Sequence, residues 1–306
     1  MRILLGVPLH ARMPDVEAIE IASTLGIPNY RPNGFHPAFA ISLNDLKKTG
    51  HEVFIRTVMG APVDAARCTL FGIWLDLWRK GDRYDYFWMI DSDISFTSTC
   101  LDSMIAAGKP IIGAGATYKA DSGIKAGLSV SRLYPREKPD KNGILKVRWL
   151  NGACTLLRAD GLFRMMATMP ELRYQRFPQY EGDNVNIGES WAFWTSTVHT
   201  FKDTKETIFI SEDYAFSQRA MDCGIDNYLD LKVKLSHWNG TKEYQVKLAG
   251  DINDGKAKAK EWDEIKRLSA YSTELHRITY PEDIVERLKG LSTKIRDEQT
   301  RKLKTG

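Results

Sequence analysis

Short apolar runs alternate with segments of helical periodicity through the first 115 residues. The apolar runs predict β-strands at residues 2–7, 51–58, 86–90 and 110–115. Between these strands, apolar positions at helical spacing predict α-helices over residues 39–48, 62–80 and 101–107. Strands and helices that alternate in this order are typical of an α/β fold with a mostly parallel sheet flanked by helices.

The second half of the chain resumes the same pattern. It predicts a strand, two helices and a further strand, over residues 147–157, 159–168, 211–222 and 228–235. The dipeptide Asn151-Gly152 interrupts the first of these strands. Beyond the last strand the sequence is charged and helical in pattern. We therefore predict one α/β domain over residues 1–240, followed by a charged helical C-terminal extension over residues 241–306.

Two carboxylates with one small residue between them directly follow the strand predicted at residues 86–90. Asp91 and Asp93 thus lie at the carboxyl end of a buried strand, where open α/β sheets bind ligands. Oxygen ligands suit Mg²⁺ or Mn²⁺, and such an ion usually completes its shell with phosphate oxygens and water. The pattern therefore predicts a divalent metal that holds a diphosphate. A solvated Asp-Ser-Asp turn is the alternative interpretation.

Other candidate residues stand at the ends of predicted elements. Pro8 directly follows the first strand, on the ligand side of a parallel sheet. Ser211 is placed to cap a helix, and Glu212 and Asp213 occupy its first turn, where the helix dipole favours negative charge. His237 follows the last predicted strand. The alternatives are simple charge pairing with the helix for the two acids and a lone histidine in a polar loop for His237.

Composition narrows the class of protein. The chain has 306 residues, of which 43% are hydrophobic, and a formal net charge of +4, which permits an anionic partner without requiring one. Its four cysteines form no CxxC pair, which favours a reducing compartment over disulfides or zinc. The sequence contains no signal-peptide pattern and no apolar run of membrane-spanning length, so we expect a soluble, cytoplasmic protein.

Positive charge is concentrated in residues 117–148, which carry eight Lys or Arg against three Asp or Glu. The functional interpretation is a patch for an anionic acceptor or for donor phosphates. The alternative interpretation is a solvated surface loop.

The order and spacing of these signals resemble the GT-A fold of nucleotide-sugar-dependent glycosyltransferases, over about residues 1–240. The resemblance implies a Rossmann-like α/β fold with a mixed, mostly parallel sheet flanked by helices. In that family a DxD motif, an xED motif and a C-terminal histidine recur, and the matching residues here are Asp91-Ser92-Asp93, Glu212-Asp213 and His237. Residues 62–67, which end in Arg67, resemble the arginine-bearing helix that precedes the DxD strand. Residues 149–153 resemble the strand and turn that line the sugar and acceptor site.

The resemblance implies a role in donor binding for several matching residues. Asp93 would bind Mn²⁺ or Mg²⁺ directly, and Asp91 would contact the ribose or reach the metal through water. His237 would supply a further metal ligand, and Ser92 would lie in the donor site between the two acids. Arg67 would meet the nucleotide.

For the reaction itself, the resemblance implies that Asp213 is the general base and that Glu212 holds a hydroxyl of the donor sugar. Trp149, Asn151 and Gly152 would line the donor site, with core or lid packing as the alternative for Trp149. The donor would be a nucleoside-diphosphate sugar, with a UDP-sugar expected first. A base at Asp213 favours inverting transfer.

The acceptor is expected to be soluble, because the sequence predicts no membrane anchor. The compact chain with basic stretches also resembles glycosyltransferases encoded by bacteriophages, some of which glycosylate hydroxymethylated bases in DNA. A modified DNA base is therefore one predicted acceptor, in the host cytoplasm, and a saccharide is the alternative. Two other functions stay open: an inactive nucleotide-sugar-binding module, and a metal-dependent nucleotidyltransferase that would release pyrophosphate.

Overall fold

The computed structural model describes residues 1–9, 15–27, 34–117, 119, 131–133, 137–176, 188–201, 205 and 207–245. Its strands are β1 (Arg2–Leu9), β2 (Glu52–Met59), β3 (Tyr86–Ile90), β4 (Ile94–Phe96), β5 (Ile111–Gly115), β6 (Arg132–Leu133), β7 (Ile144–Trp149), β8 (Cys154–Arg158), β9 (Arg173–Gln175), β10 (Glu189–Trp191), β11 (Thr197–Thr200), β12 (Thr207–Ile210), β13 (Asn227–Asn239) and β14 (Lys242–Gln245). Its helices are α1 (Asp15–Thr24), α2 (Pro37–Leu46), α3 (Val63–Arg79), α4 (Thr99–Ala106), α5 (Ala159–Thr168) and α6 (Glu212–Asp222), with a 3₁₀ turn at Pro170–Leu172.

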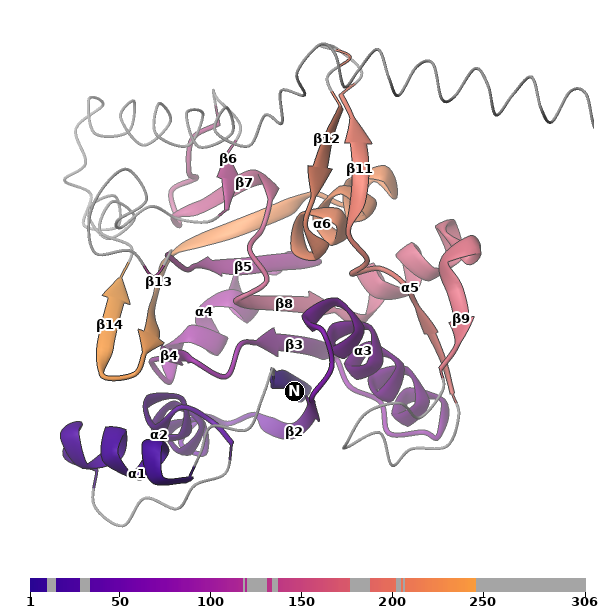
Figure 1. Ribbon diagram of the computed structural model, residues 1–306. Coiled ribbons are helices and arrows are strands. Elements are labelled where there is room, and N and C mark those ends of the chain that lie inside the picture. The colour runs from indigo at the N-terminus through magenta and orange to yellow at the C-terminus, as the bar shows by residue number, and fades with distance from the viewer. Residues whose placement is uncertain are drawn as a thin grey trace, which may run out of the picture. The chain divides into compact units, whose positions relative to one another are not determined.

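One large sheet forms the centre of the described residues (Figure 1). Within these residues it has ten strands, eight of them in the order β2-β1-β3-β8-β5-β13-β7-β6. Strands β2, β1, β3, β5 and β13 run in one direction, because β8 is antiparallel to both β3 and β5. Strand β7 runs antiparallel to β13, and β4 and β14 pair with the carboxyl-terminal half of β13. The prediction of an α/β fold with a mixed, mostly parallel sheet flanked by helices is confirmed.

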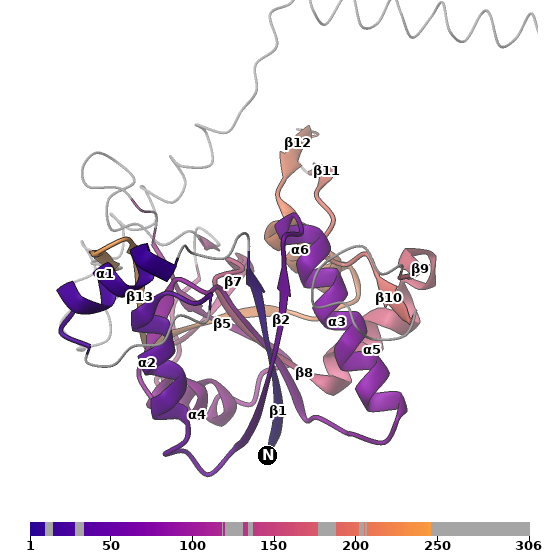
Figure 2. The same ribbon diagram turned by 60° about the horizontal axis from the view of Figure 1, so that its bottom comes forward.

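Helices cover both faces of the sheet (Figure 2). On one face, Phe39 of α2 and Leu101 of α4 join a buried apolar cluster with the sheet. On the other face, Leu70 of α3, Met165 of α5 and Phe216 of α6 join a second cluster. This two-sided burial explains why β3 is apolar at every position and shows no alternation, since both of its faces are covered.

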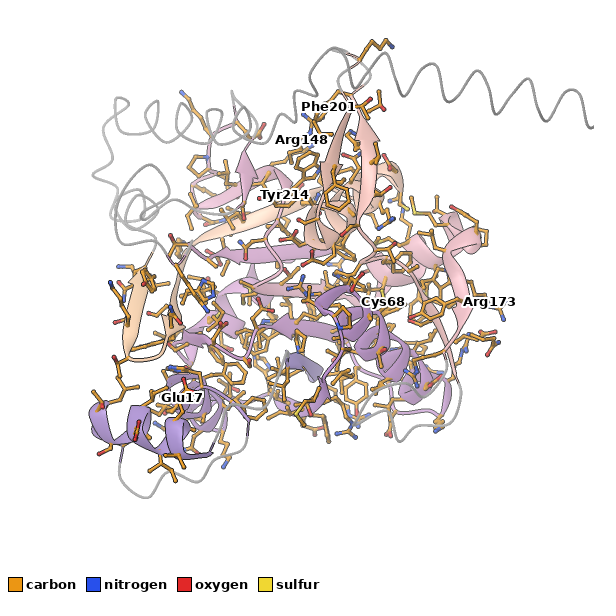
Figure 3. The ribbon with its side chains drawn as sticks, in the orientation of Figure 1. Glu17, Cys68, Arg148, Arg173, Phe201 and Tyr214 are labelled. Atoms are coloured by element: carbon orange, nitrogen blue, oxygen red, sulfur yellow. The ribbon has the colours of Figure 1, made fainter. Side chains whose placement is uncertain are left out.

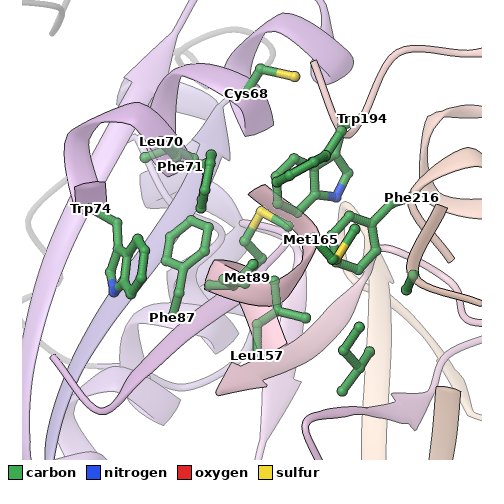
Figure 4. Packing of buried hydrophobic residues seen from close by; sticks show 14 of the residues in the cluster. Cys68, Leu70, Phe71, Trp74, Phe87, Met89, Leu157, Met165, Trp194 and Phe216 are labelled. Atoms are coloured by element: carbon green, nitrogen blue, oxygen red, sulfur yellow. The ribbon is translucent and has the colours of Figure 1, made fainter. Parts of the chain in front are cut away.

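The second cluster is rich in aromatic rings (Figure 4). Trp194 stacks on Phe216 of α6, with ring centroids 4.4 Å apart and an interplanar angle of 7°. Phe71 of α3 packs against both Trp194 and Trp74, at centroid distances of 5.9 and 5.7 Å. These rings join α3 to α6, so the aromatic cluster fixes the distance between the helix that carries Arg67 and the helix that begins with the Glu212-Asp213 pair.

The strand predicted over residues 147–157 is in fact two strands that are not neighbours. Strands β7 and β8 are separated in the sheet by β13 and β5, and Asn151-Gly152 lies in the connection between them. Pro8, predicted to lie in the first loop, belongs to β1, where it pairs in register with Val58. Strand β1 extends past Pro8 because its parallel pairing with the edge strand β2 continues to Leu9.

The predicted C-terminal extension lies mostly outside the described residues, which end at residue 245. Lys242–Gln245, expected to be helical, form β14 and pair with β13, so the main sheet continues beyond Gly240. In the part of the chain that the structure describes, no helix is both long enough and apolar enough to cross a lipid bilayer.

The stacked pair in the core gives a direct test of this packing. Replacing Trp194, which is 1% exposed, by Ala should lower the free energy of unfolding by about 3–5 kcal/mol, because it removes the ring and leaves a cavity. The control is Val198→Ala, at a side chain that is 64% exposed, with an expected change within about 0.5 kcal/mol. Urea denaturation measures both, and equal effects would contradict the role of the stack.

Candidate active site

Several of the predicted site residues lie at the carboxyl edge of the parallel strands. Asp91 and Asp93 follow β3, and His237 lies in the second half of β13; Thr117, which was not among the predicted residues, follows β5. The turn that carries Gly152 reaches the same edge, because it precedes β8, which runs in the opposite direction. The topology therefore brings together residues that are far apart in the sequence.

A buried arginine joins two of the predicted acids. Arg67 of α3 is 3% exposed, and its Nη1 donates to Oε1 of Glu212 at 2.7 Å while its Nη2 donates to Oδ1 of Asp91 at 3.1 Å. The guanidinium thus links the end of β3 to the first turn of α6. The side chain is buried on these two carboxylates and holds them together, and the contact between Arg67 and the nucleotide stays a prediction.

The plane of this guanidinium lies flat on Gly152. A Cβ atom added to Gly152 would come within 2.4 Å of Cζ, Nη1 and Nη2 of Arg67, so a side chain at this position cannot coexist with the observed arginine. The backbone N–H of Gly152 donates to Oδ2 of Asp213 at 3.1 Å. Gly152 therefore contacts both the arginine and the second acid of α6, and close backbone approach is the reason that glycine suits this position.

Contacts from a distant hairpin fix α3 just beyond Arg67. Ser190 in β10 donates through Oγ to the carbonyl of Cys68 at 2.6 Å, and Nη1 of Arg176 donates to the carbonyl of Thr69 at 2.9 Å. Arg176 also forms a buried ion pair with Asp76, at 3.2 Å. These bonds hold the backbone that carries Arg67, so the position of its guanidinium depends on the β9–β10 hairpin as well as on its own partners.

The group formed by Arg67 and the three surrounding carboxylates carries more negative than positive charge. Burial lowers the pKa of Arg67, but the negative charges of Asp91, Glu212 and Asp213 outweigh it and raise that pKa. Burial raises the pKa of Asp91 despite the opposing effect of Arg67. Burial and the neighbouring charge of Asp213 raise the pKa of Glu212. One guanidinium thus faces three carboxylates, an arrangement that favours a further cation or hydrogen-bond donor.

The second predicted acid, Asp93, belongs to a separate group. Its Oδ2 lies 3.5 Å from Nε2 of His237 and accepts a hydrogen bond from Nζ of Lys119 at 2.5 Å. Nδ1 of His237 donates to the carbonyl of Thr117 at 2.8 Å. Burial alone would raise the pKa of Asp93, but His237 and Lys119 outweigh it and lower that pKa to about 2. Asp93 is therefore ionised wherever the protein is folded near neutral pH.

The donor set of Asp93 and His237 fits a divalent cation with an incomplete protein shell. Because Nδ1 of His237 donates to a carbonyl, Nε2 is the nitrogen that offers a lone pair toward Asp93 in the neutral imidazole. Asp91, the third predicted ligand, is instead bonded to Arg67. Among the described residues, no three His, Cys, Asp or Glu side chains are grouped to hold a metal. A metal here would need oxygens from a diphosphate or water to complete its shell.

The Asp-Ser-Asp turn is held by residues that the sequence did not single out. The carbonyl of Ser92 accepts the N–H of His36, and Nε2 of His36 contacts the carbonyl of Gly240 at 2.8 Å. The His36 ring stacks on Trp238, with centroids 5.3 Å apart, and the N–H of Trp238 donates to the carbonyl of Asp93. The observed helix α2 begins at Pro37, two residues before the predicted start, and the His36-Pro37 dipeptide was the signal that could have identified His36 as an N-cap.

Two predicted donor-site residues are buried in supporting positions. Trp149 packs its ring against Tyr214 and Phe201, with centroids 5.2 and 6.0 Å away, so it has no open face for a sugar or base. Figure 3 labels Tyr214, Phe201 and the nearby Arg148, whose guanidinium carbon lies 4.4 Å from the Phe201 ring. Trp149 is 2% exposed and belongs to a buried apolar cluster, and its predicted place in the donor site stays a prediction.

Asn151 is also a structural residue. Its Nδ2 donates to the carbonyl of Ala114 and to Oγ of Ser131, and its Oδ1 accepts the N–H of Ala153. These bonds shape the turn around Gly152, and the contact between Asn151 and the donor stays a prediction.

The first turn of α6 differs in detail from the prediction. Ser211 precedes the helix, but its hydroxyl donates to Oδ1 of Asp213 at 2.5 Å and does not accept from a helix N–H. The N–H of Tyr214 donates to the same oxygen at 2.8 Å. Asp213 therefore accepts two hydrogen bonds on Oδ1 and one, from Gly152, on Oδ2. Three donors fix the orientation of this carboxylate, and Oδ2 retains a lone pair.

No protein-family model and no curated protein matches the chain. Among solved structures, the chain is similar to A197 from STIV, with a TM-score of 0.39, 13% identity, and coverage of 80% of this chain and 91% of that chain. It is also similar to a mutant of Drosophila β-1,4-galactosyltransferase 7 in complex with manganese, UDP-Gal and xylobiose, with a TM-score of 0.30, 15% identity, and coverage of 87% and 79%. A nucleoside-diphosphate-sugar pyrophosphorylase from Vibrio cholerae has a TM-score of 0.35, 10% identity, and coverage of 75% and 91%. At such distances, the likeness does not identify the activity.

The contact between Gly152 and Arg67 can be tested by adding one methyl group. Gly152→Ala should lower the free energy of unfolding by about 1–3 kcal/mol, because the guanidinium must leave its position between the acids. Gly50→Ala is the control: nothing lies within 4 Å of the added atom there, and the expected change is within about 0.5 kcal/mol. Equal stability of the two variants in urea would contradict the stacking.

The charge balance predicts a pH-dependent effect of removing the arginine. Arg67→Met should cost about 3–5 kcal/mol of unfolding free energy at neutral pH, because it leaves buried carboxylates unpaired. The folded state raises the pKa values of Asp91 and Glu212 above their ordinary values of 3.8 and 4.5, so folding favours their protonated forms. The cost should therefore shrink as the pH falls toward about 4 and these acids take up protons.

Urea denaturation of wild type and variant at both pH values measures this difference. Arg79→Met is the control, since Arg79 lies on the same helix and pairs with Glu189 while 47% exposed, and its effect should be small. A cost for Arg67→Met that does not change with pH would contradict the account of unpaired acids.

Proposed function

We propose that this protein transfers a sugar from a nucleoside-diphosphate sugar to a hydroxyl group of an acceptor. The observation that carries the proposal is the joining of Asp91, Glu212 and Asp213 around one buried arginine, beside the Asp93–His237 pair. Transfer needs a group that accepts a proton, a group that orients the donor sugar and a cationic site for the leaving diphosphate. These residues are chemically suited to the three tasks.

In the proposed reaction the acceptor oxygen attacks the anomeric carbon of the donor. The bond from that carbon to the acceptor oxygen forms as the bond to the diphosphate oxygen breaks, and the acceptor proton passes to Asp213. The hydrogen bonds from Ser211, Tyr214 and Gly152 orient the Asp213 carboxylate, and its Oδ2 has a lone pair for that proton. Attack opposite to the leaving group inverts the anomeric configuration.

Glu212 would accept a hydrogen bond from a hydroxyl of the donor sugar while Arg67 holds it in place. Asp91, bonded to the same arginine, would face the ribose of the nucleotide. Asp93 and His237 would hold Mn²⁺ or Mg²⁺, which when bound would neutralise negative charge on the departing nucleoside diphosphate. Ser92 would lie in the donor site, in the turn between Asp91 and Asp93.

A product assay tests the proposal against its alternatives. The protein is incubated with UDP-sugars and other nucleotide sugars, with and without Mn²⁺, and the nucleotide products are separated. Release of nucleoside diphosphate with transfer or hydrolysis of the sugar is the expected result. Release of pyrophosphate from a sugar phosphate and a nucleoside triphosphate would indicate a nucleotidyltransferase, and nucleotide binding without turnover would indicate an inactive binding module.

The role of Asp213 predicts a specific kinetic change. Asp213→Asn should lower kcat by about 10² or more, because the amide does not accept the acceptor proton, while the Kd for the donor stays near that of wild type. Asp222→Asn, at the exposed carboxyl end of the same helix, is the control and should leave kcat unchanged. Wild-type turnover in Asp213→Asn would remove this residue from the mechanism.

The acceptor is proposed separately from the donor. The basic segment at residues 117–148 supports an anionic acceptor, with hydroxymethylated DNA as the specific proposal, although Lys119 and Lys146 already pair with Asp93 and Asp226. A saccharide is the alternative. A transfer assay that offers hydroxymethylcytosine DNA and a panel of saccharides to the loaded enzyme decides between them, and transfer to saccharides alone would overturn the DNA proposal.

A further inference from the structure

A lysine lies on the carboxylate that faces the proposed diphosphate site. Nζ of Lys119 is 2.5 Å from Oδ2 of Asp93, the same oxygen that lies 3.5 Å from Nε2 of His237. The Lys119 side chain is 30% exposed, so solvent and solutes reach this group. An internal cation therefore sits where Asp93 and His237 converge.

This contact has a consequence for any cation that approaches from solution. The ammonium and a divalent ion would share one carboxylate oxygen, and two cations so close repel each other strongly in a partly buried site. Binding of a metal to Asp93 thus requires Lys119 to leave. The hydrogen bond from His237 holds the backbone at Thr117, two residues before the lysine. We therefore expect the Lys119 side chain to move its ammonium only to a neighbouring partner.

A displaced lysine at this position needs a new anionic partner. The carboxylates of Glu212 and Asp91 already accept hydrogen bonds from Arg67. A donor diphosphate placed on the Asp93–His237 side would bring oxygens that carry negative charge to the immediate surroundings of Lys119. A lysine ammonium is a compact point charge on a flexible stem, which suits phosphate binding with a change of partner.

We infer that Lys119 exchanges partners, from Asp93 in the free protein to a phosphate oxygen of the donor in the complex. This inference rests on the proposed function and adds a diphosphate-binding residue that the sequence motifs do not contain. Lys119 then has two opposite effects. It opposes the binding of a metal alone, and it favours the binding of a nucleoside diphosphate, so the site takes up the metal and the diphosphate together.

Two binding measurements on Lys119→Met test the two effects. Binding of Mn²⁺ alone, followed by electron paramagnetic resonance of the free ion, should become about tenfold tighter, because the competing ammonium is gone. Binding of UDP, measured by calorimetry with Mn²⁺ saturating for each protein, should become about tenfold weaker, because a charge-assisted hydrogen bond is lost. A role in folding alone would not move the two affinities in opposite directions.

Matched variants complete the experiment. Lys119→Arg keeps the charge and should change both affinities less than Lys119→Met does, and Lys146→Met, which removes a lysine paired with Asp226, should change neither. Unchanged affinities for both Mn²⁺ and UDP in Lys119→Met would overturn the inference, as would a change in only one of them. Wild-type protein that binds none of UDP, GDP, ADP and dTDP would overturn the proposed function itself.

Discussion

The buried guanidinium of Arg67 is the interaction on which the arrangement of the acids depends. It bonds Asp91 at the end of β3 and Glu212 at the start of α6, and it lies flat on Gly152, which in turn bonds Asp213. Three chain segments meet at this one side chain. Burying an arginine is costly unless its partners are well placed, and here the surrounding carboxylates keep its pKa above the ordinary value. A single positive charge thus fixes the geometry of a group of three carboxylates.

The site has two halves, one around Arg67 and one around Asp93, and their carboxylates differ in how they are paired with positive charge. On the Arg67 side, acids with raised pKa values are held by one cation, which suits them to accept hydrogen bonds and protons. On the other side, Asp93 stays fully ionised between His237 and Lys119, which suits it to hold cations. The β3 strand ends between the two, so a donor that spans both would place its sugar near Glu212 and its diphosphate near Asp93. The proposed transfer chemistry needs this division.

Local pattern predicted much of the fold and part of the site. The buried β3 strand followed by Asp91 and Asp93, and the acids that begin α6, are set by short-range periodicity and capping, and both lie as expected. The separation of β7 from β8 was not predictable, because it depends on which strands pair across the sheet. The same holds for Arg67 and Trp149: their residue types fit a binding site, and only tertiary packing reveals that carboxylates and aromatic rings enclose them. Nothing local distinguishes Lys119 from seven other cations of its segment.

A crystal structure of the protein grown with UDP and Mn²⁺ tests most directly whether this edge of the sheet is a donor site. The anomalous signal of manganese locates the metal independently of the protein density. We expect one manganese ion bound by Asp93 and His237, with the diphosphate of UDP as its other ligand and with Arg67 still on Asp91 and Glu212. A diphosphate bound elsewhere on the protein, or manganese bound away from Asp93 and His237, would contradict the assignment of this site.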